Sequence, residues 1–133
     1  MSEDNAKIII ENRQSSEDGK EVFTVEELCK FKIKGNSVYI LYKSEGVMSK
    51  IKVEGKTVTV TRMGEFSSEM VYREGEETAF LYKMPYGTME MSLLTKKADV
   101  KFCEDGGEIF LDYKLLFSGT ETENSMKIKV KIN

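Results

Sequence analysis

The ten glycines of this chain fall where an alternation of apolar and polar residues pauses. They are Gly19, Gly35, Gly46, Gly55, Gly64, Gly75, Gly87, Gly106, Gly107 and Gly119, and most of the intervals between them run from 9 to 16 residues. This spacing is typical of short strands joined by tight turns. Several of the turns also carry Asn, Asp or Glu beside the glycine, as tight hairpins favour. The sequence therefore predicts an all-β chain.

Between the glycines the apolar residues recur with a period of two. The segment MKIKVKI, residues 126–132, alternates strictly between apolar residues and lysine. The segment 109–117 repeats the pattern, with Tyr113 on its apolar face. Each expected strand thus has one buried and one solvated face, as in antiparallel sheets, and no stretch shows a helical period.

About ten such segments follow one another directly, with no room for crossover helices. Residues 1–133 are expected to form one domain, an antiparallel up-and-down meander. An open sheet of this size would expose two edges, so closure into a barrel of about 8–10 strands is predicted. The apolar parity changes between Gly87 and Gly106, which predicts a β-bulge near Thr95–Lys97.

Composition excludes several classes of function. A net charge of −3 and a pI near 5.2 argue against a general nucleic-acid binder. The absence of histidine removes the commonest general base and the usual imidazole ligands of metals. No phosphate-binding loop, dinucleotide motif or nucleophile elbow is present. We expect no metal or other cofactor. An enzymatic activity ranks third, below ligand binding and protein interaction, because it would need carboxylates together with Tyr or Lys gathered in the barrel mouth.

The chain begins MSEDNAK, with acidic residues where a secretory signal would carry basic ones. No apolar stretch approaches the ~20 residues of a membrane helix. Cys29 and Cys103 are too few for a disulfide framework, and both thiols are expected to be reduced. These features predict a cytoplasmic protein without a membrane association.

The stretch FLYKMPYGTMEMSLLT, residues 80–95, predicts a hairpin that turns at Pro85–Gly87. Phe80 and Tyr82 share one parity before the turn, and Met89 and Met91 continue on the inner face after it. Two interpretations remain open for these side chains. They fill gaps in a solid core, or they form the adaptable lining of a pocket.

Two charged residues share the parity of apolar neighbours, which is informative because an unpaired buried charge is costly. Arg62 extends the face of Val58 and Val60, either as a rim residue bonded to backbone carbonyls or as an anion anchor inside the barrel mouth. Glu27 lies on the face of Cys29. It either pairs with Arg62 or is turned outward by a local bulge, and the bulge is the favoured interpretation.

Four tyrosines are candidates to present hydroxyl groups to a cavity, or else to bond to backbone carbonyls: Tyr39, Tyr42, Tyr82 and Tyr113.

The order of four segments resembles the YwiB-like family of low-GC Gram-positive bacteria, a domain of unknown function with a lipocalin-like, calycin-type barrel. The segments are VYILYKSEG, VTVTRMGEFSSEMVYREGE, FLYKMPYGTMEMSLLT and GGEIFLDYKLLFSGTETENSMKIKVKI, which run from about residue 38 to 132. Arg62 matches an arginine of the family pattern. A carboxylate often follows two residues after the tyrosine that matches Tyr42, and Ser44 takes that place here. The resemblance implies the fold and no activity.

Two functions are expected from these features. The first is a barrel that binds a small amphipathic or anionic molecule. Its candidate ligand-binding residues are Arg62, Tyr42, Phe80, Tyr82, Met89, Met91, Tyr113 and Glu27. The alternative is a protein-interaction module or homodimer that uses the barrel rim or a strand edge and binds no ligand. A monomer or a homodimer is compatible with either.

Overall fold

The computed structural model describes residues 4–133, and within them every regular element is a β-strand. The strands are β1 (Ala6–Ser16), β2 (Gly19–Lys34), β3 (Ser37–Ser44), β4 (Val47–Glu54), β5 (Thr57–Met63), β6 (Ser68–Tyr72), β7 (Glu77–Met84), β8 (Gly87–Cys103), β9 (Gly106–Phe117) and β10 (Thr120–Ile132). Among the residues described, no helix is long and apolar enough to cross a membrane. The first three residues of the acidic N-terminal stretch lie outside the described range.

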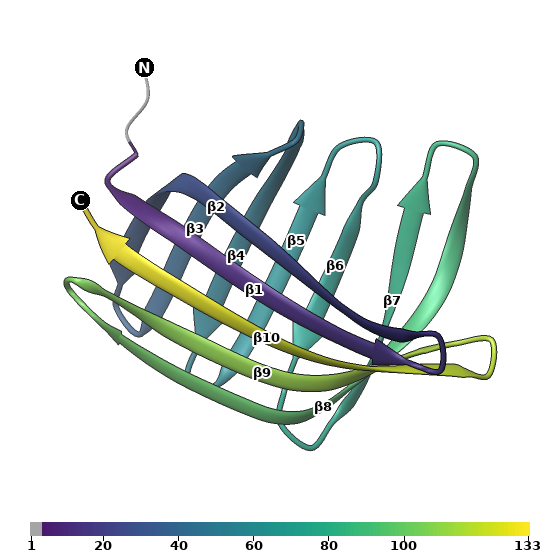
Figure 1. Cartoon of the computed structure of the whole chain (residues 1–133). Helices are drawn as coiled ribbons and strands as arrows, with labels where there is room; N and C mark the ends of the chain where they lie inside the picture. Colours follow the sequence, from purple (N-terminus) through teal and green to yellow (C-terminus); the bar gives the residue numbers. More distant parts are fainter. Residues whose placement is uncertain (1–3) are drawn as a thin grey trace.

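The strands form one antiparallel sheet in the order β6-β5-β4-β3-β2-β1-β10-β9-β8-β7. Strand β1 therefore pairs with both β2 and β10, so the meander continues from the last strand to the first. Figure 1 shows β2, β1, β10 and β9 crossing in front of the more upright β3 to β7. The predicted antiparallel barrel of about ten strands is confirmed.

Closure is incomplete at the seam between β6 and β7. Ser67 and Lys83 exchange two backbone hydrogen bonds of 2.8 and 2.9 Å there and form an isolated bridge. Farther along, the Thr78 hydroxyl donates to the carbonyl of Val71 at 2.8 Å. The short β6 pairs in a ladder with β5, and β7 with β8. The barrel is thus nearly closed, with a weak line along the β6–β7 seam.

Strand β8 carries the predicted bulge. Thr95 faces Tyr113 and Lys97 faces Asp112, so Lys96 is the extra residue. The turn between β6 and β7 docks at this point, because the Gly75 N–H donates to the Thr95 carbonyl at 2.8 Å. The bulge lets one long strand bend and pair with β9 along its length, while the turn satisfies backbone groups that β7 no longer reaches.

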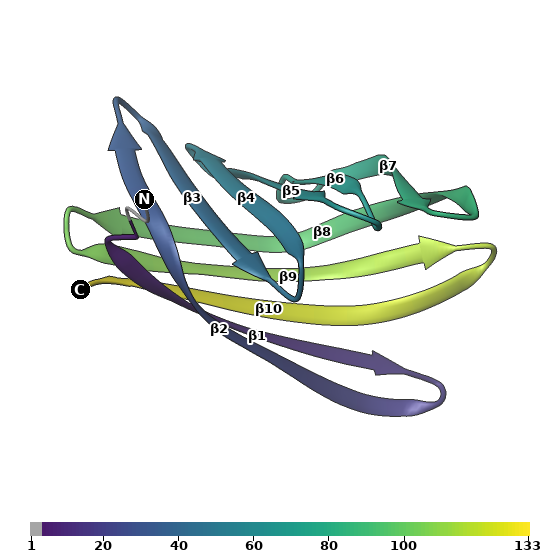
Figure 2. The same cartoon turned by 90° about the horizontal axis from the view of Figure 1, so that it is seen from above.

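The two ends of the barrel differ because the strands differ in length. Strands β1, β2, β8, β9 and β10 have 11 to 17 residues, whereas β3 to β7 have 5 to 8. At the end where β1 begins and β10 ends, buried aliphatic side chains and the stacked rings of Phe31 and Phe102 fill the interior. At the opposite end, here called the mouth, the β1–β2 and β7–β8 hairpins stand apart on either side of β9 and β10 (Figure 2).

Strand β2 leaves its neighbour β3 partway along its length. Residues Cys29–Lys34 pair with β3, whereas the ladder with β1 runs from Gly19 to Cys29. The first half of β2 therefore has a partner on one side and a free edge on the other.

Candidate functional site

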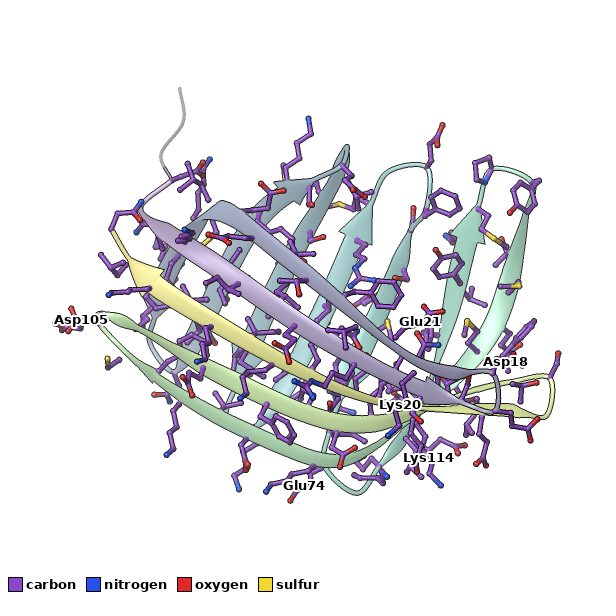
Figure 3. All side chains as sticks on the ribbon, in the orientation of Figure 1. Asp18, Lys20, Glu21, Glu74, Asp105 and Lys114 are labelled. Carbon is purple, nitrogen blue, oxygen red and sulfur yellow. The ribbon has the colours of Figure 1, made fainter. Side chains whose placement is uncertain are left out.

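A cavity of about 280 Å³ lies inside the mouth. Its wall comes from β1, β5, β6, β7, β8, β9 and β10, and Figure 3 shows the side chains that these strands carry. The lining residues are Asn12, Gln14, Arg62, Met70, Tyr72, Phe80, Tyr82, Met89, Met91, Tyr113, Leu115, Asn124 and Met126. Six of the eight candidate residues named from the sequence are among them.

Among the described residues that line this cavity, Arg62 is the one cationic residue, and it is half-buried. On the inner face of the sheet it stands directly between Ser49 of β4 and Ser68 of β6, both buried. These small side chains leave space around the guanidinium group. In residues 4–133 this group makes no hydrogen bond or ion pair with another part of the protein.

Arg62 also borders two further hollows. One, of about 260 Å³, lies beside the main cavity and is lined in part by Tyr42, Ser49, Ser68 and Tyr82. The other, of about 460 Å³, follows the β6–β7 seam and contains residues of both strands. The guanidinium therefore stands where the mouth cavity meets an opening in the barrel wall.

Two tyrosines form the polar floor of the cavity. The rings of Tyr72 and Tyr113 meet edge to face, with centroids 5.0 Å apart. Burial raises the pKa of both hydroxyls above 10.0, and the positive charge of Arg62 opposes this rise in each case. Both groups are consequently neutral at ordinary pH and act as hydrogen-bond donors or acceptors.

Asn12 joins this floor from β1. Its Nδ2 donates to the Tyr113 hydroxyl at 3.3 Å, while its Oδ1 is buried and has no partner among residues 4–133. In the same part of the chain Thr95 Oγ1, on β8 beside the bulge, is also buried without a partner. An unpaired buried acceptor is costly, so a donor group placed in the cavity beside Asn12 would be stabilised.

The remaining wall is apolar and soft. Four methionines line the cavity together with Phe80: Met70, Met89, Met91 and Met126. Unbranched thioether side chains adapt to differently shaped neighbours at low cost. Met89 and Met91 therefore lie on a cavity wall, on the inner face that their parity predicts, while Leu93 beyond them is fully buried in the core.

Two expectations were wrong. No bulge turns Glu27 outward, because the β1–β2 register runs without a shift from Gly19 to Cys29. Glu27 keeps the inner parity but lines a separate hollow of about 450 Å³ where β2 leaves β3, and it forms no ion pair with Arg62 among the described residues.

Tyr39 faces outward, with the Lys52 ammonium 5.7 Å from its ring centroid. Tyr42 is buried and borders the hollow beside Arg62.

Several polar residues of the site were missed in the sequence. Asn12, Ser49, Ser68 and Asn124 all occupy inward positions between apolar neighbours. The same parity rule that singled out Arg62 would have found them. They were passed over because an uncharged polar side chain at an inward position is a weaker anomaly than a charge.

In the part of the chain that the structure describes, no group of three or more His, Cys, Asp or Glu residues could hold a metal ion. The site is instead a cationic and hydroxyl-lined cavity with an apolar wall. Fold and site together define a class: a nearly closed, ten-stranded antiparallel meander barrel with a partly polar cavity at one end.

The chain belongs to the YwiB-like family, a domain of unknown function (DUF1934) whose profile matches residues 8–130. The uncharacterized β-barrel protein YwiB of Bacillus subtilis (strain 168) is 31% identical over 88 residues, which are 62% of this chain and 61% of that protein. The match thus spans less than two-thirds of the relative's length. The crystal structure of the ywiB protein from Bacillus subtilis superposes with a TM-score of 0.88 at 22% identity, over 96% of this chain and 91% of that one, which supports the fold.

Proposed function

We propose that this protein binds a small amphipathic anion in the mouth cavity, with the anionic group at Arg62 and the apolar part against the methionines and Phe80. The observation that carries the proposal is the half-buried guanidinium of Arg62, which has no partner within the described residues and faces a cavity. A cation in such a place loses solvation, and a bound carboxylate, sulfonate or phosphate would offset that loss with charge-assisted hydrogen bonds.

The neighbours of Arg62 favour an anion over a neutral ligand. The hydroxyl groups of Ser49 and Ser68 flank it on the same sheet face and can both donate to an oxyanion. Among the described residues that line the main cavity there is no carboxylate. The electrostatic environment is therefore positive at one point and apolar elsewhere, which suits a molecule with a single charged end.

The size of the cavity favours a small ligand. Pockets that bind small molecules usually measure ~300–1,000 Å³, and the mouth cavity of about 280 Å³ lies at the lower limit of that range. The adjoining hollow of about 260 Å³ shares Arg62 and Tyr82 and offers room for a second part of the molecule. We expect a ligand with one ring system or a short chain.

The proposal is binding and not catalysis. Burial raises the pKa of the Tyr72 and Tyr113 hydroxyls on the cavity floor, so these groups are poor general bases at neutral pH. We place this binding in the cytoplasm, since Cys29 and Cys103 are both free thiols.

Two fluorescent probes test the role of the charge. The first, 8-anilinonaphthalene-1-sulfonate, carries an anionic group on an apolar ring system; the second, N-phenyl-1-naphthylamine, has the same rings without the sulfonate. We expect one saturable site for each on the native protein. The substitution Arg62→Met, which keeps an apolar stem without the charge, should weaken sulfonate binding about tenfold or more and leave the neutral probe within about twofold.

Arg13→Met is the matched control, because Arg13 is exposed and already paired with Glu11 at 2.8 Å. It should change neither affinity. Equal weakening of both probes by Arg62→Met would mean that the substitution perturbs the cavity as a whole, and no saturable binding of either probe would exclude the site. Native mass spectrometry of protein taken from its own host then reports the mass of a natural ligand.

A further inference from the structure

The first half of β2 is a free sheet edge, separate from the weakly joined β6–β7 seam. Residues 20–28 pair with β1 and have no ladder with β3 or any other described strand. Exposed edges of this kind pair readily with another chain, and natural proteins protect them with charges, bulges or prolines. This stretch has neither a bulge nor a proline over nine residues, and its charged residues, Lys20, Glu21, Glu26 and Glu27, stand at its two ends on either side of Val22–Val25.

The orientation of the backbone groups along this edge follows from the paired part of β2. The Phe31 N–H donates to Asn5 Oδ1 at 2.8 Å, and Asn5 donates to the Phe31 and Cys29 carbonyls at 2.9 and 3.1 Å. Odd-numbered residues thus direct their backbone groups toward the β1 side. Because these groups alternate along a strand, the even-numbered residues from Lys20 to Leu28 direct theirs to the free edge.

The side chains on this edge are accessible. Val22, Phe23 and Leu28 are 59%, 51% and 56% exposed, which is high for apolar residues within a strand. Lys20 and Glu21 follow the β1–β2 turn, and their side chains point to opposite sides of β2 (Figure 3). Glu26 lies farther along the same edge and pairs with Lys7 of β1.

We propose that this edge binds the same edge of a second copy of the chain, so that two β2 strands pair antiparallel about a two-fold axis through Phe23. In this register the edge-facing Lys20 lies opposite the partner subunit's Glu26. By symmetry, Glu26 lies opposite the partner subunit's Lys20. Val22 faces the partner subunit's Thr24, and the two Phe23 rings meet on the inner face. Each pair of edge-facing residues exchanges two backbone hydrogen bonds, for about eight in all.

Charge selects this register over its neighbours. Antiparallel pairing requires edge-facing residues of the two copies to stand opposite one another. In each allowed register the two-fold axis therefore passes through one residue, and neighbouring registers move the axis by one residue. An axis at Val22 would bring Asp18 against the partner's Glu26, and an axis at Thr24 would bring Glu21 against the partner's Glu27, each twice. An axis at Val25 gives no pair of opposite charges on the free edge. Only the axis at Phe23 gives two attractive pairs and no repulsive one.

A proline on the edge is the first test. Thr24→Pro removes an N–H that faces the free edge and donates no hydrogen bond to β1. The barrel should therefore still fold, while the ladder between the two copies loses hydrogen bonds. Sedimentation equilibrium over a micromolar concentration series should show a monomer–dimer equilibrium for the native chain and monomer for the variant. Far-ultraviolet circular dichroism checks that the variant is folded.

A charge swap tests the register. Lys20→Glu alone and Glu26→Lys alone each replace two attractive pairs by two repulsive ones and should weaken dimerisation about tenfold or more; the double variant should recover most of it. Lys56→Glu, an equal charge change on an exposed turn residue at the other end of the barrel, is the control and should have no effect. A native chain that stays monomeric throughout, or a dimer unaffected by Thr24→Pro and by the charge changes, would overturn the proposal.

Discussion

Asn12 on β1 donates a hydrogen bond to the hydroxyl of Tyr113 on β9, reaching over the inner face of β10 that separates the two strands. The bond ties residues 101 positions apart and holds the Tyr113 ring against Tyr72. Tyr113 on the cavity floor is therefore held by Asn12 at its hydroxyl and by Tyr72 at its ring.

Removing this hydroxyl should destabilise the protein. Tyr113→Phe leaves the Asn12 amide without its partner in a cavity, and we expect the free energy of unfolding to fall by about 1–2 kcal/mol in urea denaturation. Tyr86→Phe is the control, since Tyr86 is 82% exposed in the β7–β8 turn and should change it by less than about 0.5 kcal/mol. Equal stability of the two variants would show that the Asn12–Tyr113 bond contributes nothing.

Stability should fall at alkaline pH because of Cys29. Burial, and secondarily the charge of Asp4, raises the pKa of this thiol from 9.0 to about 11. Above pH 9.0 the thiol loses its proton in the unfolded chain but keeps it in the folded chain. The contribution of Cys29 to the free energy of unfolding is therefore fully present below pH 9.0 and is lost as the pH rises toward 11. The slope is at most about 1.4 kcal/mol per pH unit for one proton, and the buried tyrosines add to it above pH 10.0.

Urea midpoints measured between pH 8 and 10 check this interpretation. Cys29→Ala should flatten the decline between pH 9 and 10, whatever its effect on absolute stability. Cys103→Ala should leave the profile unchanged, since that thiol is exposed. An unaltered slope in the Cys29 variant would exclude the thiol as its source.

Gly107 should tolerate no side chain. A Cβ there would lie 2.0 Å from the Lys101 carbonyl oxygen and 2.7 Å from the Phe102 Cα, so β8 and β9 could not keep their spacing. We expect Gly107→Ala to lower the free energy of unfolding by about 3 kcal/mol or more. Gly119→Ala meets nothing within 4 Å and strains only a backbone at φ +79°, so it should cost about 1–2 kcal/mol. The reverse order of the two costs would contradict the steric argument.

Glu74 adds a side-chain hydrogen bond to the backbone contacts that dock the β6–β7 turn on the bulge. Its carboxylate accepts a hydrogen bond from the Ala98 N–H at 3.0 Å, just beyond the extra residue Lys96. Glu74→Ala should cost about 1 kcal/mol in thermal or urea unfolding, because the Ala98 amide loses its acceptor. Glu77→Ala, on an exposed residue three positions away, should be nearly neutral. A neutral Glu74 variant would mean that water replaces the carboxylate.

Much of the fold could be predicted because strand signals are local. The bulge at Thr95–Lys97 was readable from a change of parity within one segment, and the hairpin at Pro85–Gly87 from a turn between two alternating runs. The inward positions of Arg62, Met89, Met91 and Tyr113 follow from the same rule.

The parity rule predicted the face of Glu27 correctly but not its neighbours. Parity placed it on the inner face, yet it does not meet Arg62, because β2 leaves β3 at Cys29 and carries Glu27 into a separate hollow. The divergence arises from strand length and tilt, which no local pattern records. Ser49 and Ser68 become relevant for the same reason, since only the register of β4, β5 and β6 sets them beside Arg62.

Alternation and turn chemistry act over a few residues, so the all-β class, the division into strands and the buried side of each strand could be predicted from the sequence. Three features appear only in the assembled barrel: the wall is weakly joined at the β6–β7 seam, one end is hollow, and Arg62 faces this hollow without a partner among residues 4–133. These features depend on how ten strands of unequal length meet around a ring. That is a property of the whole barrel and of no single strand.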